Sequence, residues 1–145
     1  MNSLRIARPA GFVLIGVLLG TVLMACKSGP PRGQVSGKVT FKGNPVTEGT
    51  VTFHNPKAGH AGEAKLGPGG SYVITTVEGG LVVGDYGVMI TPLTHIVDLE
   101  PGKTPPVDVE KPAPDIPKKY RRQETSALKA QVKEGKNVFD FDMKP

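Results

Sequence analysis

Two groups of side chains in this sequence could support catalysis or metal binding. The three histidines, His54, His60 and His95, could hold a metal ion if they converged, because imidazole is a common ligand and a site needs three or four groups. Asp140 and Asp142 alternate along one expected strand, so both carboxylates lie on one face, as an acid/base pair requires. However, the histidines form no compact ligand motif, and the apolar residues between the aspartates turn the carboxylates to water. We therefore expect no catalytic residue, no metal site and no cofactor.

The single cysteine, Cys26, follows an N-terminal segment that differs from the rest of the chain. Arg5 and Arg8 are the only charged residues of this segment, and residues 11–25 are almost all small or apolar. The apolar run is shorter than the roughly 20 residues that a membrane-spanning helix needs, and no basic flank follows it. The pattern predicts a signal peptide over residues 1–25, and a lone cysteine leaves no partner for an internal disulfide.

Leu23-Met24-Ala25-Cys26 resembles the lipobox of bacterial lipoproteins. The resemblance implies transfer of a diacylglycerol to the Cys26 thiol, cleavage between Ala25 and Cys26, N-acylation, and anchorage of an exported protein in a lipid membrane. Two or three acyl chains anchor a protein durably, because each buried methylene contributes about 0.8 kcal/mol. Lys27 in place of aspartate resembles sorting to the outer membrane, facing the periplasm or the cell surface. The other interpretation of Cys26 is a buried or idle thiol.

Residues 26–32 are expected to be the lipidated cysteine and a short tether, because the stretch is polar, contains Pro30 and Pro31, and has nothing to bury. When extended, it reaches only about 20 Å, so the domain that follows should lie close to its membrane. This domain is expected over residues 33–145. Without residues 1–25, which hold two of the 18 basic side chains, 16 basic and 13 acidic side chains remain, so the net charge falls from +5 to +3. This mild charge indicates no particular polyanion as a partner.

After the tether, apolar and polar residues alternate, which predicts β-strands. The pattern begins with Val35, Gly37, Val39 and Phe41. It returns at Val51 and Phe53, Ala64 and Leu66, Tyr72 and Ile74, Tyr86 to Ile90, Leu128 to Val132, and Phe139 to Met143. Turns rich in glycine and asparagine separate these stretches, and no helical periodicity is present. The sequence thus predicts an all-β domain of about seven strands, a number that suits a sandwich.

Several motifs resemble carboxypeptidase regulatory-like, transthyretin-like domains. Residues 36–51 (SGKVTFKGNPVTEGTV) resemble the opening hairpin of that family, in which a Gly-x-Val strand leads through Gly-x-Pro-Val to a second strand. Residues 70–72 are similar to its Gly-x-aromatic strand start, and residues 84–88 to its Pro-Gly-x-Tyr-x-Val strand, with Val83 replacing the proline. Residues 116–141, which include IPKKY and KEGKNVFDF, resemble the ending of small bacterial lipoproteins built on this domain. The resemblance implies a seven-stranded Greek-key (prealbumin-like) β-sandwich and no particular activity.

Residues 93–115 break the regular spacing, since they carry several prolines and no sustained alternation. Proline removes the backbone donor that a ladder needs, so a long proline-rich loop is expected here. Such a loop is either functional or mobile. Mixed charges and the lack of an aromatic anchor favour the mobile alternative.

Residues 118–122 form the strongest local charge feature. They are Lys118, Lys119, Tyr120, Arg121 and Arg122. An exported protein rarely meets nucleic acid, so we expect none as a partner; anionic lipid headgroups or an acidic envelope polymer are better candidates for this surface-binding patch. The other interpretation is a solvated segment in which Ile116, Pro117 and Tyr120 pack on the sandwich edge.

Together, these patterns predict a membrane-anchored, non-catalytic lipoprotein of the cell envelope, acting as a binding or structural module for an envelope protein or polysaccharide. The alternative is a small envelope hydrolase or metal-dependent enzyme with ligands from the loop histidines and carboxylates.

Overall fold

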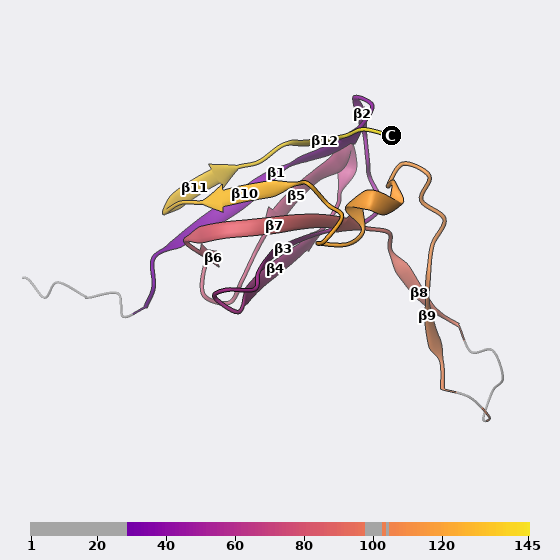
Figure 1. The fold of residues 1–145 in the computed structure, drawn as a ribbon, viewed down its shortest axis with the longest axis horizontal. Coiled ribbons are helices and arrows are strands. Elements are labelled where there is room, and N and C mark those ends of the chain that lie inside the picture. The colour runs from indigo at the N-terminus through magenta and orange to yellow at the C-terminus, as the bar shows by residue number, and fades with distance from the viewer. Residues whose placement is uncertain (1–28, 98–102, 104) are drawn as a thin grey trace, which may run out of the picture.

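The computed structural model describes residues 29–97, 103 and 105–145 of the chain. Ala25, Cys26 and the expected signal peptide lie outside the described residues. The described residues form an all-β domain, as predicted, with two short 3₁₀ turns at Pro68–Gly70 and Lys118–Tyr120 (Figure 1). No helix in this part of the chain is long and apolar enough to cross a membrane.

The first sheet is built around β1 (Arg32–Phe41), the longest strand. Its neighbours on one edge are antiparallel: β6 (Leu81–Val82), β5 (Ser71–Ile74) and β2 (Asn44–Pro45). Its neighbours on the other edge are parallel: β11 (Gly135–Val138) and β12 (Phe141–Met143). Gly33 pairs with Gly135 and Val39 with Phe141, so β11 and β12 keep one register and act as a single interrupted strand.

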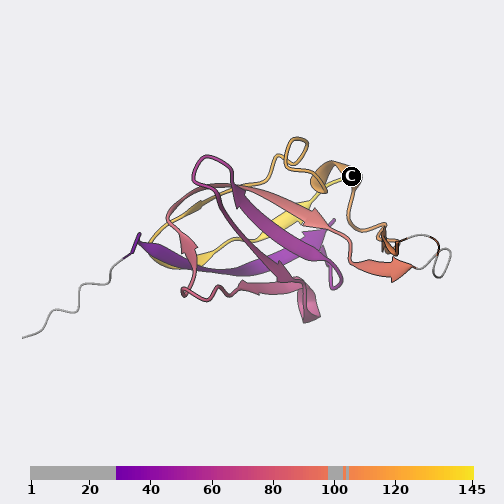
Figure 2. The ribbon, with the colours of Figure 1, turned by 90° about the horizontal axis from the view of Figure 1, so that it is seen from below.

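The second sheet is antiparallel throughout. Its strand order is β10 (Lys129–Val132), β7 (Gly84–Thr91), β3 (Thr50–Asn55) and β4 (His60–Lys65). The two sheets face each other (Figure 2), and their inward-facing residues form one hydrophobic cluster. The alternating apolar positions of the sequence are therefore the core positions, because successive side chains of a strand point to opposite faces.

Phe53 lies at the centre of the core and is fully buried. Its ring centroid lies 6.0–6.3 Å from those of four other aromatic rings, on Tyr72, Tyr86, Phe139 and Phe141. The tilted geometry is the arrangement that aromatic pairs favour, so this cluster joins strands of both sheets.

The parallel edge of the first sheet is interrupted at Phe139. The carbonyl of Phe139 accepts a hydrogen bond of 2.7 Å from the hydroxyl of Tyr72. A Cβ on Gly37 would lie 1.8 Å from this carbonyl oxygen, so only glycine fits at that position of β1. Burial, and then the charge of Asp140, raise the pKa of Tyr72 above its ordinary value, which keeps the hydroxyl protonated as a donor.

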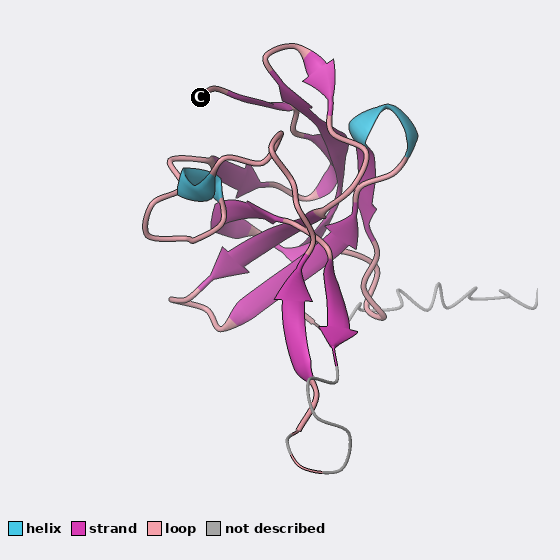
Figure 3. Ribbon diagram, turned by 90° about the vertical axis from the view of Figure 1, so that its right-hand side faces the viewer, coloured by secondary structure: helices cyan, strands magenta, loops and turns pink. Residues whose placement is uncertain are grey.

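Each of the seven predicted stretches contains a strand, but the described residues form twelve strands in all. The additional strands are short and depend on partners that are distant in sequence. Two of them overturn the prediction that residues 93–115 are a loop: β8 (Thr94–Val97) pairs with β9 (Val107–Glu110) in a hairpin that projects from the sandwich (Figure 3). The prolines lie between or after these strands, so the paired stretches keep their backbone donors.

The domain also begins earlier than predicted. Arg32 belongs to β1, and the carbonyl of Pro31 accepts a hydrogen bond of 2.9 Å from the backbone N–H of Val83. The Arg32 guanidinium donates to the Gly80 carbonyl at 3.0 Å and pairs with Glu78. The end of the expected tether is thus part of the folded domain.

Candidate functional site

The histidines lie on separate parts of the domain. His54 is on the outer face of β3, where its Nδ1 is hydrogen-bonded to Oε1 of Gln123; His60 begins β4, and His95 is exposed on the β8–β9 hairpin. Within the described residues, no three His, Cys, Asp or Glu side chains lie close enough together to hold a metal ion.

Asp140 and Asp142 are on the outer, solvent-facing side of the first sheet, and both carboxylates accept hydrogen bonds from β1 or the turn after it. Oδ1 of Asp140 accepts one of 2.8 Å from the backbone N–H of Lys38. Oδ1 of Asp142 accepts hydrogen bonds from the hydroxyl of Thr40 at 2.9 Å and from the backbone N–H of Gly43 at 3.1 Å. Its carboxylate also pairs with Lys144. The hydrogen bond from Lys144, followed by those from Gly43 and Thr40, lowers the pKa of Asp142 to about 2. These contacts fasten the last strand to the first hairpin.

The structure divides the basic segment 118–122 into buried and exposed parts. Tyr120 is buried, and its hydroxyl accepts a hydrogen bond of 3.0 Å from the backbone N–H of Lys144. Lys118, Lys119 and Arg122 are exposed, and Nζ of Lys119 donates to the Pro145 carbonyl. The packing of Ile116 and Tyr120 against the core agrees with the interpretation of a segment packed on the sandwich edge.

The Arg121 side chain is mostly buried and is held by hydrogen bonds to the protein. Its Nε and Nη2 donate to the carbonyl of Ile116 at 3.0 and 2.8 Å, and Nη2 also reaches the carbonyl of Ala113 at 3.0 Å. Nη1 pairs with Glu110 at 2.7 Å. Arg121 therefore ties the end of the projecting hairpin and the segment after it to the sandwich.

The segment 118–122 also lies far from the point where the chain enters the domain. Its contacts with Lys144 and Pro145 place it beside the end of β12, whereas the chain enters at Arg32 (Figure 1). β1 runs from that point to the β12 end and spans about 30 Å, at roughly 3.3 Å per residue. The exposed lysines and the hairpin thus share the end of the domain opposite Arg32.

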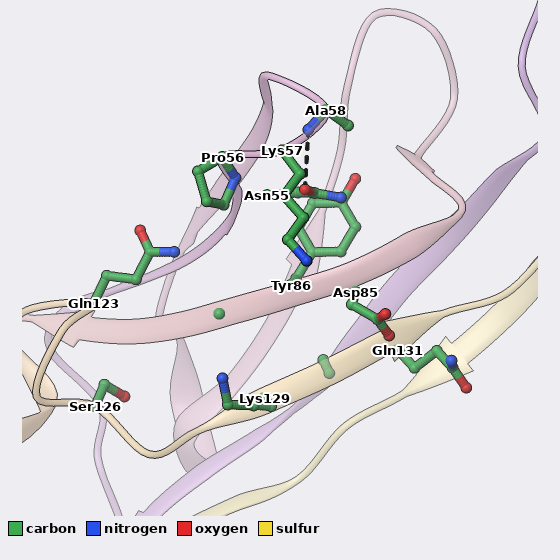
Figure 4. Close-up of a pocket in the computed structure, with 12 residues that line it drawn as sticks. Asn55, Pro56, Lys57, Ala58, Asp85, Tyr86, Gln123, Ser126, Lys129 and Gln131 are labelled. Carbon is green, nitrogen blue, oxygen red and sulfur yellow. Dashed lines mark hydrogen bonds between the residues drawn. The ribbon is translucent and has the colours of Figure 1, made fainter.

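A hollow that the sequence did not reveal lies on the outer face of the second sheet (Figure 4). Its volume is about 730 Å³, within the range of small-molecule sites. Strands β7 and β10, the turn after β3 and the loop that carries Gln123 surround it. Its polar lining residues are Asn55, Lys57, Asp85, Gln123, Ser126, Lys129 and Gln131.

Gly87 forms the floor of the hollow. It lies on β7 between His54 of β3 and Lys129 of β10. A Cβ at Gly87 would lie 3.0 Å from Nε2 of Gln123, so even a small side chain would press against the lining. A glycine at an outward position of a central strand was the one sequence signal for this site, since it lets another side chain, here Gln123, approach the sheet closely.

Two amides in the lining present their N–H groups to the hollow. Oδ1 of Asn55 accepts the backbone N–H of Ala58 at 3.1 Å. A backbone N–H only donates, so the side-chain oxygen of Asn55 must be the atom that faces Ala58. The Nδ2 group of Asn55 therefore remains as a donor for a ligand. Oε1 of Gln123 is likewise committed to Nδ1 of His54, which leaves Nε2 above Gly87.

Charged groups complete the site. Lys57 and Lys129 contribute two ammonium groups, and Asp85 contributes a carboxylate beside Gln131, its partner in the strand register. The side chains of Lys129 and Asp85 form no hydrogen bond or ion pair with any other residue that the structure describes. The hollow therefore combines free donors, free acceptors and a small excess of positive charge, and it can bind a polar ligand.

Comparison of the chain with protein-family models, curated proteins and solved structures gives no match.

Proposed function

We propose that this protein is a membrane-anchored, non-catalytic lipoprotein of the cell envelope, lipidated at Cys26. Its domain would be a transthyretin-like Greek-key sandwich that serves as a binding module. The apolar segment 11–25 and the Leu-Met-Ala-Cys sequence that ends it support the anchor. The β1–β2 hairpin at residues 32–45 and the two sheets around one core support the fold.

The observation that carries the proposal is the start of the fold at Pro31 and Arg32, only a few residues after Cys26. Pro31 and Arg32 are already fixed by Val83 and Gly80, so residues 27–30 are all that separates Cys26 from the fold. Even when extended, the five steps from Cys26 to Pro31 reach only about 17 Å. A lipidated Cys26 would therefore hold the Arg32 end of the domain at the membrane surface.

The same geometry would fix the orientation of the domain relative to the membrane. With Arg32 at the membrane, the hairpin β8–β9 and the exposed Lys118 and Lys119 lie at the distal end (Figure 1). The basic segment would then face an envelope partner rather than the headgroups of the anchoring membrane.

The test is the variant Cys26→Ser, with Ser28→Ala as a matched control outside the lipobox. We expect the wild type and the control to show the mass of the cleaved, acylated chain and to remain with the membrane fraction. Cys26→Ser should show the mass of the uncleaved, unacylated chain, because it removes the thiol acceptor. Intact-mass analysis of each fraction decides the matter: an acylated Cys26→Ser variant, or a wild type without acyl mass, contradicts the proposal.

A further inference from the structure

We propose that the hollow on the outer face of the second sheet binds an acidic carbohydrate, a sugar that carries a carboxylate beside its hydroxyl groups. The inference concerns the domain alone and does not depend on lipidation at Cys26.

The donors of the hollow point to an acceptor-rich ligand. The internal hydrogen bonds of Asn55 and Gln123 use their oxygens and leave their N–H groups free. Lys57 and Lys129 add ammonium groups, which only donate. A carboxylate fits such a set because its two oxygens only accept when ionised, and hydrogen bonds to a charged group are the stronger ones.

The charge of the hollow favours an anion. Two lysines face one carboxylate, Asp85, so the lining carries a positive excess. Lys129 has no ion pair with a described residue to cancel its charge. Because the hollow is open to water, salt should screen this attraction.

The acceptors of the hollow fit hydroxyl groups. The Asp85 carboxylate and the Gln131 amide lie side by side on β7 and β10, and the carboxylate has no hydrogen-bond or ion-pair partner among the described residues. A sugar hydroxyl can donate to these oxygens while its neighbours accept from the amides. Tyr86 contributes to the lining but is buried at 2% exposure, so it offers no stacking platform. Recognition therefore depends on charge and hydrogen bonds rather than on ring stacking.

The hollow also has a fixed shape. Asn55 is held by Ala58, and Gln123 is held by His54, so two of its donors are positioned before a ligand arrives. The absence of a side chain at Gly87 leaves room for the Gln123 amide, which lies directly above it. Preorganised donors raise affinity because less conformational freedom is lost on binding.

The experiment is a calorimetric titration of the full chain, purified in detergent, with a short hexuronate oligosaccharide and with a neutral hexose oligosaccharide of equal length. We expect the acidic sugar to bind at least about tenfold more tightly than the neutral one, since one charged hydrogen bond corresponds to roughly that factor. The difference should shrink as salt is added.

Two variants and one control place the binding at the hollow. Lys129→Met should weaken binding of the acidic sugar at least about tenfold, by the same conversion. Lys65→Met, on the same outer face of the sheet but outside the hollow, should leave it unchanged. Gly87→Leu should abolish binding while keeping every charge, because the new side chain displaces the Gln123 amide from the hollow. Thermal unfolding of each variant tests whether the fold is intact.

The proposal is overturned by several results: no binding of the acidic sugar, equal binding of the neutral one, equal effects of Lys129→Met and Lys65→Met, or unchanged binding by a folded Gly87→Leu variant.

Discussion

Replacing Arg121 by alanine should destabilise the domain, although Arg121 belongs to a segment that the sequence presents as a surface patch. The guanidinium is one-fifth exposed and donates to two backbone carbonyls, those of Ile116 and Ala113. Without it, these partly buried acceptors lose their partner, and the segment that carries Ile116 into the core is released.

The magnitude follows from these contacts. Loss of hydrogen bonds to two carbonyls, at about 1–2 kcal/mol each, gives a decrease of about 2–4 kcal/mol in the free energy of unfolding. The pair with Glu110 adds little, because the Glu110 side chain is half exposed and such pairs are worth about 0–1 kcal/mol. With an m-value of about 2 kcal/mol per molar in urea, the unfolding midpoint should fall by about 1–2 M.

Urea unfolding of the full chain in parallel with Arg122→Ala tests this expectation. Arg122 is the adjacent residue and is exposed, so its removal should leave the midpoint unchanged. Arg121→Lys should recover less than half of the loss, because a single ammonium cannot reproduce the planar fork. An unchanged midpoint for Arg121→Ala, or full recovery by lysine, would refute the structural role of this side chain.

Two further predictions concern the parallel edge of the first sheet. Tyr72→Phe should lower the free energy of unfolding by about 1–3 kcal/mol, because the Phe139 carbonyl loses its donor; urea unfolding measures this, and an unchanged midpoint would contradict it. Asp142 has a pKa lowered to about 2, so its contribution to stability is complete above its unfolded pKa of about 4 and is lost as the pH falls towards 2. The variant Asp142→Asn should therefore make stability less dependent on pH between about 4 and 2. Thermal unfolding across this interval checks this, and an unaltered pH dependence would contradict the role of Asp142.

Much of the fold could be predicted from local patterns. Alternation placed Val35, Phe53, Tyr86 and Val132 in the core, and the structure buries all four. Of the two interpretations of residues 118–122, the one in which Ile116 and Tyr120 pack against the sandwich agrees with their burial in the core cluster. These predictions worked because a strand with one buried face needs alternating apolar and polar side chains, and this alternation can be seen in consecutive residues.

The projecting hairpin could not be predicted in the same way. Strands β8 and β9 are short, are separated by a stretch with several prolines, and are stabilised by pairing with each other. Whether a stretch such as Val107–Glu110 forms a strand depends on a partner that local sequence does not specify.

By itself, the sequence determined the apolar N-terminal segment, the single cysteine at its end, and the alternating positions that become the core of an all-β domain. Only the tertiary structure decided that the Arg121 side chain donates hydrogen bonds to backbone carbonyls while Arg122 is exposed to solvent. It also decided that Gly87, Gln123 and Lys129 meet at one hollow, because strand register brings together side chains that are far apart in the chain. Alternation fixes the face on which a side chain lies, whereas its neighbours on that face are set by the pairing of distant strands.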